Sequence, residues 1–479
     1  METHSSELKE PVRARDPRSR PRESDDSRIL LKDFDVVVTM DSEQRELHGS
    51  SVLVQGRSIL AVGQDATNSH ADIVIDGAGK VLLPGFVNTH HHLYQTVLRN
   101  APAASDRSLH GWLAALYGYW SRLDESAIGL ATQVSCAELI LSGATTTSDF
   151  HYIFPKTAPH AFDAVVRGAS STGIRFHPCR GSYTLPPSQG GLVPDSLVET
   201  ESAVLEDSVR VIERYHDSAP FAMVRVGLGP CGPLRASPSF FERVRELAAE
   251  TGALLHTHLA ETKEEEEYCL EKFGMRPVEY LRSVGWLQRN AWFAHLVHVT
   301  DEDIRALSEA GAGMSYCPTS NMVLGSGVAP VARMAGTGVR VSIGVDGSAS
   351  NDTSSMIREI RQAMLLQRVR FGADAMTARE ALRIATIGGA DVLGRGEELG
   401  SIEPGKAADL IAFDISGIEF AGAHADPVAA LVHCAADRVD FSMVNGRILV
   451  RGGVPCDESW VESACQLNQL SRELIADNT

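Results

Sequence analysis

The chain has 479 residues, of which 43% are hydrophobic and 22% charged, and its formal net charge is −18. This size and balance exclude a small module and a disordered protein, and the acidic charge argues against nucleic acid as a partner because phosphate would be repelled. The sequence has neither an apolar run of about 18 residues nor a signal-peptide pattern. We therefore expect no membrane partner and a cytoplasmic location.

Residues 1–28 differ in composition from the rest of the chain. They contain seven Lys or Arg, seven Asp or Glu and three prolines, with almost no large apolar side chains. Such a segment cannot bury enough apolar surface to offset the entropy lost on ordering. We predict a disordered tail.

Short β-rich runs separated by glycine turns occupy residues 29–86, for example DFDVVVTM and ADIVIDGAGKVLLPGFV. A similar texture returns in residues 397–460, where Asn445-Gly446 is a typical hairpin turn. The two segments predict one composite β-sandwich domain built from both chain ends. A C-terminal helix is expected over residues 461–479.

Between these segments, residues 87–396 alternate eight apolar strand candidates with helical patterns. Helices are expected near 125–142, 199–216, 237–251, 263–283 and 354–371. Eight such units over about 310 residues fit a TIM-like (β/α)8 barrel of the α/β class, in which the active site lies at the C-terminal ends of the strands. The sequence therefore predicts a catalytic barrel and indicates where its chemistry is to be sought.

Histidines end the first and the fifth of these strands. Because side chains alternate along a strand, His90 and His92 point to one side and His91 to the other, and His258 closes the fifth strand. Histidines at i and i+2 at a barrel strand end are a metal-ligand spacing. Glu261 follows three residues later, where it could serve as a proton shuttle or, alternatively, complement the dipole of the next helix.

Two further strands each end in one polar residue, His295 on the sixth and Asp346 on the eighth. A carboxylate there could ligate a metal or accept a proton from water, and a neutral imidazole could orient that water. Three histidines and a carboxylate favour one divalent ion, Zn2+ first, with Fe2+ or Mn2+ as alternatives. The expected chemistry is attack of metal-bound hydroxide on an electrophilic sp2 carbon, with protonation of the neighbouring nitrogen by Glu261.

The stretches PGFVNTHHH, HTHLAE, AHL and GVDGSASND resemble strand-end motifs of the amidohydrolase superfamily, and GSIEPGKAADL and MVNGRILV resemble its small β-domain. Within that superfamily the chain looks nearest to 8-oxoguanine deaminases, with hydroxyatrazine aminohydrolases and triazine hydrolases also near. The resemblance implies an amidohydrolase barrel in which one metal is held by four residues: His90, His92, His258 and Asp346. It also implies that Glu261 carries a proton to the ring, that His295 and Asp346 activate water, and that the protein is a homo-oligomer.

The resemblance further implies substrate contacts by Gln95 and Arg180 and a pocket wall formed by Trp112. The structural alternatives are a helix start for Gln95, an ion pair for Arg180 and a buried loop anchor for Trp112. Three positions depart from the relatives, namely Phe150, Leu296 and Tyr316, and bear on which heterocycle is accepted.

We therefore expect a hydrolytic deaminase that releases ammonia from an amino-substituted N-heterocycle, 8-oxoguanine or guanine first. The presence of both Glu261 and Asp346 supports this reaction. One alternative is removal of an alkylamine or another leaving group from a triazine or pterin at the same site. A non-catalytic barrel is the other alternative, and its mark would be a lost ligand or acid.

Overall fold

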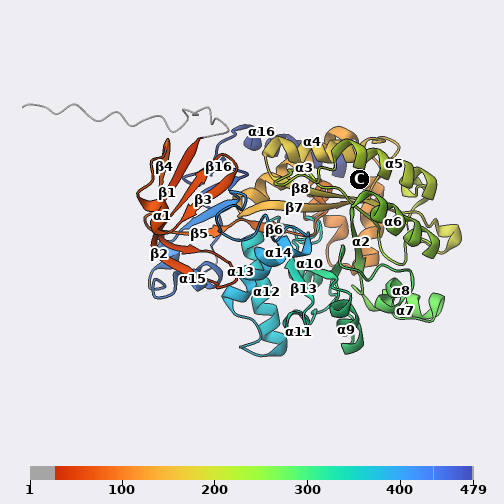
Figure 1. The fold of residues 1–479 in the computed structure, drawn as a ribbon. Helices are drawn as coiled ribbons and strands as arrows, with labels where there is room; N and C mark the ends of the chain where they lie inside the picture. The colour runs from red at the N-terminus through yellow and green to blue at the C-terminus, as the bar shows by residue number, and fades with distance from the viewer. Residues whose placement is uncertain (1–26, 192, 435, 477–479) are drawn as a thin grey trace, which may run out of the picture.

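A computed structural model describes residues 27–191, 193–434 and 436–476. Figure 1 shows its two parts, a sheet built from both chain ends and a barrel enclosed by helices. The predicted disordered tail falls outside the described residues up to residue 26, and its last residue, Arg28, begins a strand. Within the described part of the chain, no helix is long and apolar enough to cross a membrane.

Strands from the two chain ends form one nine-stranded sheet. The junction is the antiparallel pairing of β5 with β14, in which Leu82 lies opposite Ala412. Alternating apolar residues of these strands make a separate small core. The strands are β1 (Arg28–Val38), β2 (Glu46–Gln55), β3 (Ser58–Val62), β4 (Ile73–Asp76), β5 (Lys80–Pro84), β14 (Leu410–Asp414), β15 (Phe441–Val444), β16 (Arg447–Arg451) and β17 (Val454–Pro455).

Eight parallel strands close into the predicted barrel. Their side chains are almost entirely buried, as expected where a parallel sheet is covered by helices on one face and packed on the other. All eight coincide with the strand candidates in the sequence. They are β6 (Phe86–Asn88), β7 (Ala144–His151), β8 (Arg175–Ser182), β9 (Gly227–Pro230), β10 (Leu254–Leu259), β11 (Ala291–His295), β12 (Gly313–Tyr316) and β13 (Arg340–Ile343).

Helices surround the barrel, and three further α-helices lie in the segments before and after it. Those in the barrel segment are α2 (Leu109–Trp120), α3 (Glu125–Leu141), α4 (Ala161–Thr172), α5 (Glu201–Tyr215), α6 (Pro238–Thr251), α7 (Lys263–Phe273), α8 (Pro277–Ser283), α9 (Asp301–Glu309), α10 (Pro318–Val323), α11 (Val331–Thr337), α12 (Met356–Phe371), α13 (Ala378–Ala385) and α14 (Ile387–Val392). The remaining helices are α1 (Gln64–Thr67), α15 (Pro427–His433) and α16 (Ser459–Ala476).

The expected single helix over residues 263–283 is wrong, because the chain forms α7 and α8 there. Gly274 ends α7 in the left-handed conformation, with φ 68°, which glycine adopts without steric cost. Pro277 then begins α8 at its first turn, where its missing N–H is not needed.

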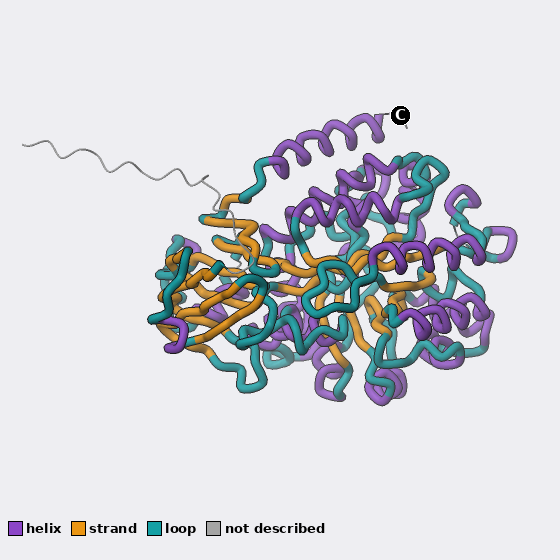
Figure 2. The backbone as a smooth tube through the Cα atoms, turned by 45° about the horizontal axis from the view of Figure 1, so that its top comes forward, coloured by secondary structure: helices purple, strands orange, loops and turns teal. Residues whose placement is uncertain are grey.

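The C-terminal helix α16 begins at Ser459, two residues before the predicted start, and lies along α3 on the outside of the barrel (Figure 2). Its residues Trp460 and Leu467 are buried there.

A buried ion pair joins the barrel to the sheet, since Arg175 donates to both carboxylate oxygens of Asp409 at 2.9 and 3.0 Å.

Candidate active site

The C-terminal ends of the barrel strands enclose a hollow with about 620 Å³ of space between atoms, part of it open to solvent. Five of the residues predicted to bind the metal, transfer protons or activate water line this hollow: His92, His258, Glu261, His295 and Asp346. His90 lies directly beneath them and is fully buried. The barrel thus brings together residues that are separated by up to 256 positions in the sequence, as the strand-end argument requires.

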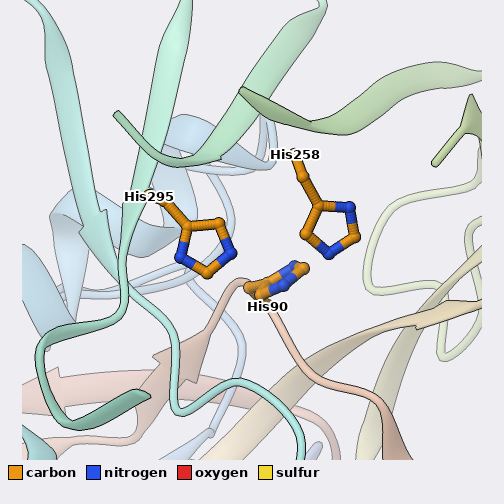
Figure 3. A group of neighbouring side chains, drawn as sticks. All are labelled: His90, His258 and His295. Atoms are coloured by element: carbon orange, nitrogen blue, oxygen red, sulfur yellow. The ribbon is translucent and has the colours of Figure 1, made fainter. Parts of the chain in front are cut away.

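Nitrogen and oxygen donors converge at the bottom of this hollow. The Nε2 atoms of His90 and His92 lie 3.4 and 3.3 Å from Asp346 Oδ1. His92 Nε2 is also 3.1 Å from His258 Nε2. Figure 3 shows the rings of His90, His258 and His295 turned toward one another, and the possible ligand atoms of these three residues lie within 4.8 Å of each other.

Hydrogen bonds behind the histidines fix which ring nitrogen is free. His256 Nδ1 lies 2.8 Å from the Trp292 carbonyl, which only accepts, so the proton is on Nδ1. His256 Nε2 must then accept from His90 Nδ1 at 2.8 Å, which leaves His90 Nε2 with a bare lone pair. His92 reaches the same state because its Nδ1 donates to the Phe150 carbonyl at 2.8 Å.

These bare nitrogens fit a divalent cation. His90 Nε2 is buried without any hydrogen-bond partner, and an unpaired buried polar atom costs about 1–3 kcal/mol. The Nε2 atom of His258 lies 3.1 Å from that of His92 and can face the same ion. With the Asp346 carboxylate, the donor set is that of a zinc, iron or manganese site.

His295 has the opposite tautomer. Asn321 Nδ2 donates to His295 Nδ1 at 3.0 Å, so the ring proton lies on Nε2. That nitrogen is 3.7 Å from Glu261 Oε2 and 4.0 Å from Asp346 Oδ2. His295 is therefore arranged to donate a hydrogen bond into the hollow, which suits the orientation of water.

Asp346 is held on two sides. Ser320 Oγ donates to its Oδ2 at 2.6 Å, and the Gly347 N–H donates to its Oδ1 at 2.6 Å. Ser320 and Asn321 both lie on α10, in the stretch CPTSNM, so one short helix supports both the carboxylate and the imidazole of the site. We did not predict these two residues as functional, and a polar pair in the first helix after a barrel strand was the available signal.

Backbone strain is concentrated at the same strand ends. Ala260, His295, Leu296 and Asp346 have φ values of 52°, 78°, 47° and 63°. Non-glycine residues rarely occupy this region, and each such residue costs about 1–3 kcal/mol unless its surroundings hold it. The chain turns sharply here, which directs the His295 and Asp346 side chains into the hollow.

Burial and neighbouring charges separate the protonation states of the site residues. Burial lowers the pKa of His92 to about 3 and that of His295 to about 4, so both rings are neutral at pH 7. Burial raises the pKa of Glu261 well above its ordinary value, and the carboxylates of Asp346 and Glu265 raise it further. For Asp346, burial acts in the same direction, but His90, His92 and His295 together hold its pKa well below the ordinary value.

Three buried carboxyls behind the site each accept hydrogen bonds from the backbone of a strand-end loop. Glu265 accepts from the N–H groups of Ala260 and Glu261, both at 3.0 Å. Asp149 accepts from the N–H group of Leu93, and Glu359 from that of Thr319. Burial raises the pKa of each of these three carboxyls to about 7. These hydrogen bonds hold the backbone of the loops that surround the site.

His91 points away from the donor set, as the strand alternation predicts. Its Nε2 lies 3.0 Å from Ser354 Oγ and 3.1 Å from Ser135 Oγ. Ser354 Oγ is also 2.8 Å from Ser348 Oγ, in the loop that follows Asp346. His91 thus couples the strand carrying two histidines to the loop carrying the carboxylate.

The predicted substrate contacts divide into two groups. Gln95 and Trp112 line the hollow, and Gln95 Nε2 donates to the Tyr152 hydroxyl at 3.0 Å. Arg180 does not line it, because its guanidinium is paired with Glu199 and Asp207 and stacked on Phe154. The structural alternative noted for Arg180 in the sequence is therefore what is observed.

Another arginine, Arg235, lines the hollow instead. None of the three divergent positions does so. Phe150 packs behind the histidine rings, Leu296 is buried beyond His295, and the Tyr316 hydroxyl accepts from Gln367.

Comparisons with known proteins agree with this architecture. The amidohydrolase family model matches residues 81–449. The chain is 45% identical to 8-oxoguanine deaminase of Pseudomonas aeruginosa, over 83% of this chain and 88% of the relative. It is 36% identical to hydroxydechloroatrazine ethylaminohydrolase of Pseudomonas sp. strain ADP, over 88% and 91%.

Among solved structures, a mutant atrazine chlorohydrolase of Arthrobacter aurescens, complexed with zinc and atraton, superposes with a TM-score of 0.89. Its sequence is 33% identical, and the match covers 92% of this chain and 100% of that one. With the family match over most of the chain, this likeness establishes that the protein is a member of the amidohydrolase family.

Proposed function

We propose that the protein is a hydrolytic deaminase that releases ammonia from an amino-substituted oxo-purine, with 8-oxoguanine and guanine as the first substrates to test. The observation that carries this proposal is the pairing of a bare-nitrogen donor set with a buried acid, Glu261, whose pKa is raised by burial. The relative named 8-oxoguanine deaminase supports the ring class.

In this proposal His90, His92, His258 and Asp346 hold one divalent ion, and zinc is the proposed metal because a structural neighbour is complexed with it. A bound divalent ion supplies a positive charge that lowers the pKa of water toward neutrality. The hydrogen bonds to Asp346 from Ser320 and Gly347 keep one carboxylate orientation, and those behind His90 and His92 keep their Nε2 atoms bare.

The protein's own groups then manage two proton transfers. His295 Nε2–H and the Asp346 carboxylate orient a water molecule against the ring carbon that bears the amino group, and Asp346 takes the proton of that water. Glu261 gives its proton to the adjacent ring nitrogen. The proton on Asp346 then goes to the departing amine, which leaves as ammonia, while Glu261 takes back the remaining hydroxyl proton as the ring C=O forms, so both acids return to their starting states.

The test is ammonia release by the zinc-loaded protein from 8-oxoguanine, guanine, isocytosine, isoxanthopterin and hydroxyatrazine, with ring absorbance followed in parallel. Ammonia from an oxo-purine supports the proposal. An absorbance change with ethylamine or another product instead of ammonia would assign the protein to the activity named for its triazine-ring relative. No change with any ring would refute the proposed function.

We also propose that the protein works as a homo-oligomer in the cytoplasm, on the strength of the family resemblance. Sedimentation velocity of the zinc-loaded protein tests the assembly, and a monomer at micromolar concentration would contradict it.

A further inference from the structure

Four arginines are buried in the described part of the chain, and three of them have a carboxylate partner. Arg175 pairs with Asp409, Arg180 with Glu199 and Asp207, and Arg395 with Glu398. The fourth, Arg235, is only 7% exposed, and no Asp or Glu among the described residues forms an ion pair with it. Because a buried guanidinium remains charged, leaving it without an anionic partner is costly.

Arg235 lies in the wall of the catalytic hollow, so a molecule bound there can supply a hydrogen-bond acceptor. Two phenols and a thiol, Tyr117, Tyr183 and Cys231, interact with it most strongly. Its charge also acts on the Glu261 and Glu265 carboxyls. The guanidinium carbon stands 5.7 Å from the centre of the Tyr183 ring, and Nε is buried without a hydrogen-bond acceptor. The protein therefore presents a desolvated donor to whatever occupies the hollow.

The charges around the hollow restrict what that occupant offers. Glu261, Glu265 and Asp346 line the same space. A phosphate or carboxylate would bring a full negative charge close to the Asp346 carboxylate, and like charges at short range in a buried site are unfavourable. A ring oxo group carries only a partial charge, or a delocalised one in its enolate form, and still accepts two hydrogen bonds from a guanidinium.

Gln95 supplies the complementary acceptor. Its Nε2 is committed to Tyr152, and its Oε1 is buried without a partner. Glycine at position 347 leaves room for the Gln95 amide, because a Cβ on that residue would lie 1.8 Å from Gln95 Oε1. Besides the proposed reacting groups, His295 and Glu261, the hollow thus offers Arg235 as a donor and Gln95 as an acceptor, which together match the C=O and N–H of a lactam.

We propose that Arg235 is a specificity-determining residue that binds an oxo group of the substrate ring, with Gln95 accepting from a ring N–H. This inference rests on the proposed function, and it names the substrate class as lactam-containing heterocycles. Arg235 takes the role that the sequence resemblance gave to Arg180.

The test compares two ligands that differ by one oxygen, hypoxanthine and purine, neither of which carries the amino group to be removed. Their dissociation constants for the zinc-loaded protein are measured by calorimetry or by competition, in the wild type and in Arg235→Met. We expect the preference for hypoxanthine over purine to fall by about 10- to 100-fold in Arg235→Met, the range for a hydrogen bond to a charged group. Arg235→Lys should restore part of it.

Arg243→Met is the matched control, because Arg243 is 49% exposed and pairs with Glu201 on the surface. It should leave the preference unchanged. An Arg235→Met protein that folds, by circular dichroism, and keeps the wild-type preference would overturn the assignment. Neither ligand is turned over, so this binding result is independent of ammonia release. Failure of the ammonia assay alone would refute the proposed function. A reduced preference for hypoxanthine in Arg235→Met would still support the contact to the oxo group.

Discussion

Replacing Glu261 by Gln keeps the shape of the side chain and removes the proton that it can give. The loop that carries it is held through its backbone by Glu265, not through the Glu261 side chain, so the loop should stay in place. Loss of a positioned general acid–base typically costs 10²- to 10⁴-fold in rate, or about 3–5 kcal/mol of barrier. We expect Glu261→Gln to lower kcat by about that factor.

Turnover is measured by ammonia release on the best substrate, and metal content by elemental analysis of the same sample. Glu261 is not in the proposed ligand set, so the variant should retain stoichiometric zinc. Glu267→Gln, an exposed acid on α7, is the matched control and should keep wild-type rates. A Glu261→Gln protein with zinc bound and kcat within threefold of wild type would refute the proton-transfer role.

Other perturbations test the remaining parts of the structure. Asp346→Ala should abolish zinc retention on dialysis while the fold survives by circular dichroism, and full retention would remove Asp346 from the ligand set. Asp409→Asn leaves Arg175 buried beside a neutral partner and should lower the free energy of unfolding in urea by about 3–5 kcal/mol. Much of this loss should be recovered in the double variant Arg175→Met, Asp409→Leu. A double-variant loss as large as the sum of the single losses would contradict the pairing of these two residues. Burial raises the pKa of Glu359 to about 7 against 4.5 in an unfolded chain, so its contribution to stability is complete below pH 4.5 and is lost as the pH rises through 7. The stability of wild type relative to Glu359→Gln should therefore fall by up to about 3 kcal/mol between pH 5 and pH 8, and a constant difference would argue against a buried titrating acid.

The sequence alone determined the architecture and the chemical residues. Eight apolar strand segments at regular spacing predict a closed barrel, because parallel strands buried on both faces read as near-continuous apolar runs. Polar residues directly after such strands must meet at one end of the barrel. For that reason the strand-end residues that line the hollow could be named from local signals, and the joining of both chain ends in one β-domain followed from their similar β-rich texture.

The tertiary structure decided the features that depend on contacts between distant segments. The tautomers of His90 and His295 follow from His256 and Asn321, which lie on other elements. Arg180 and Arg235 look alike in the sequence, and only their neighbours distinguish an arginine neutralised by Glu199 and Asp207 from one left free in the hollow. Local patterns report what a residue is and which face of its element it occupies. Which charges surround it is set by packing across the barrel, and this packing determines which arginine lines the hollow.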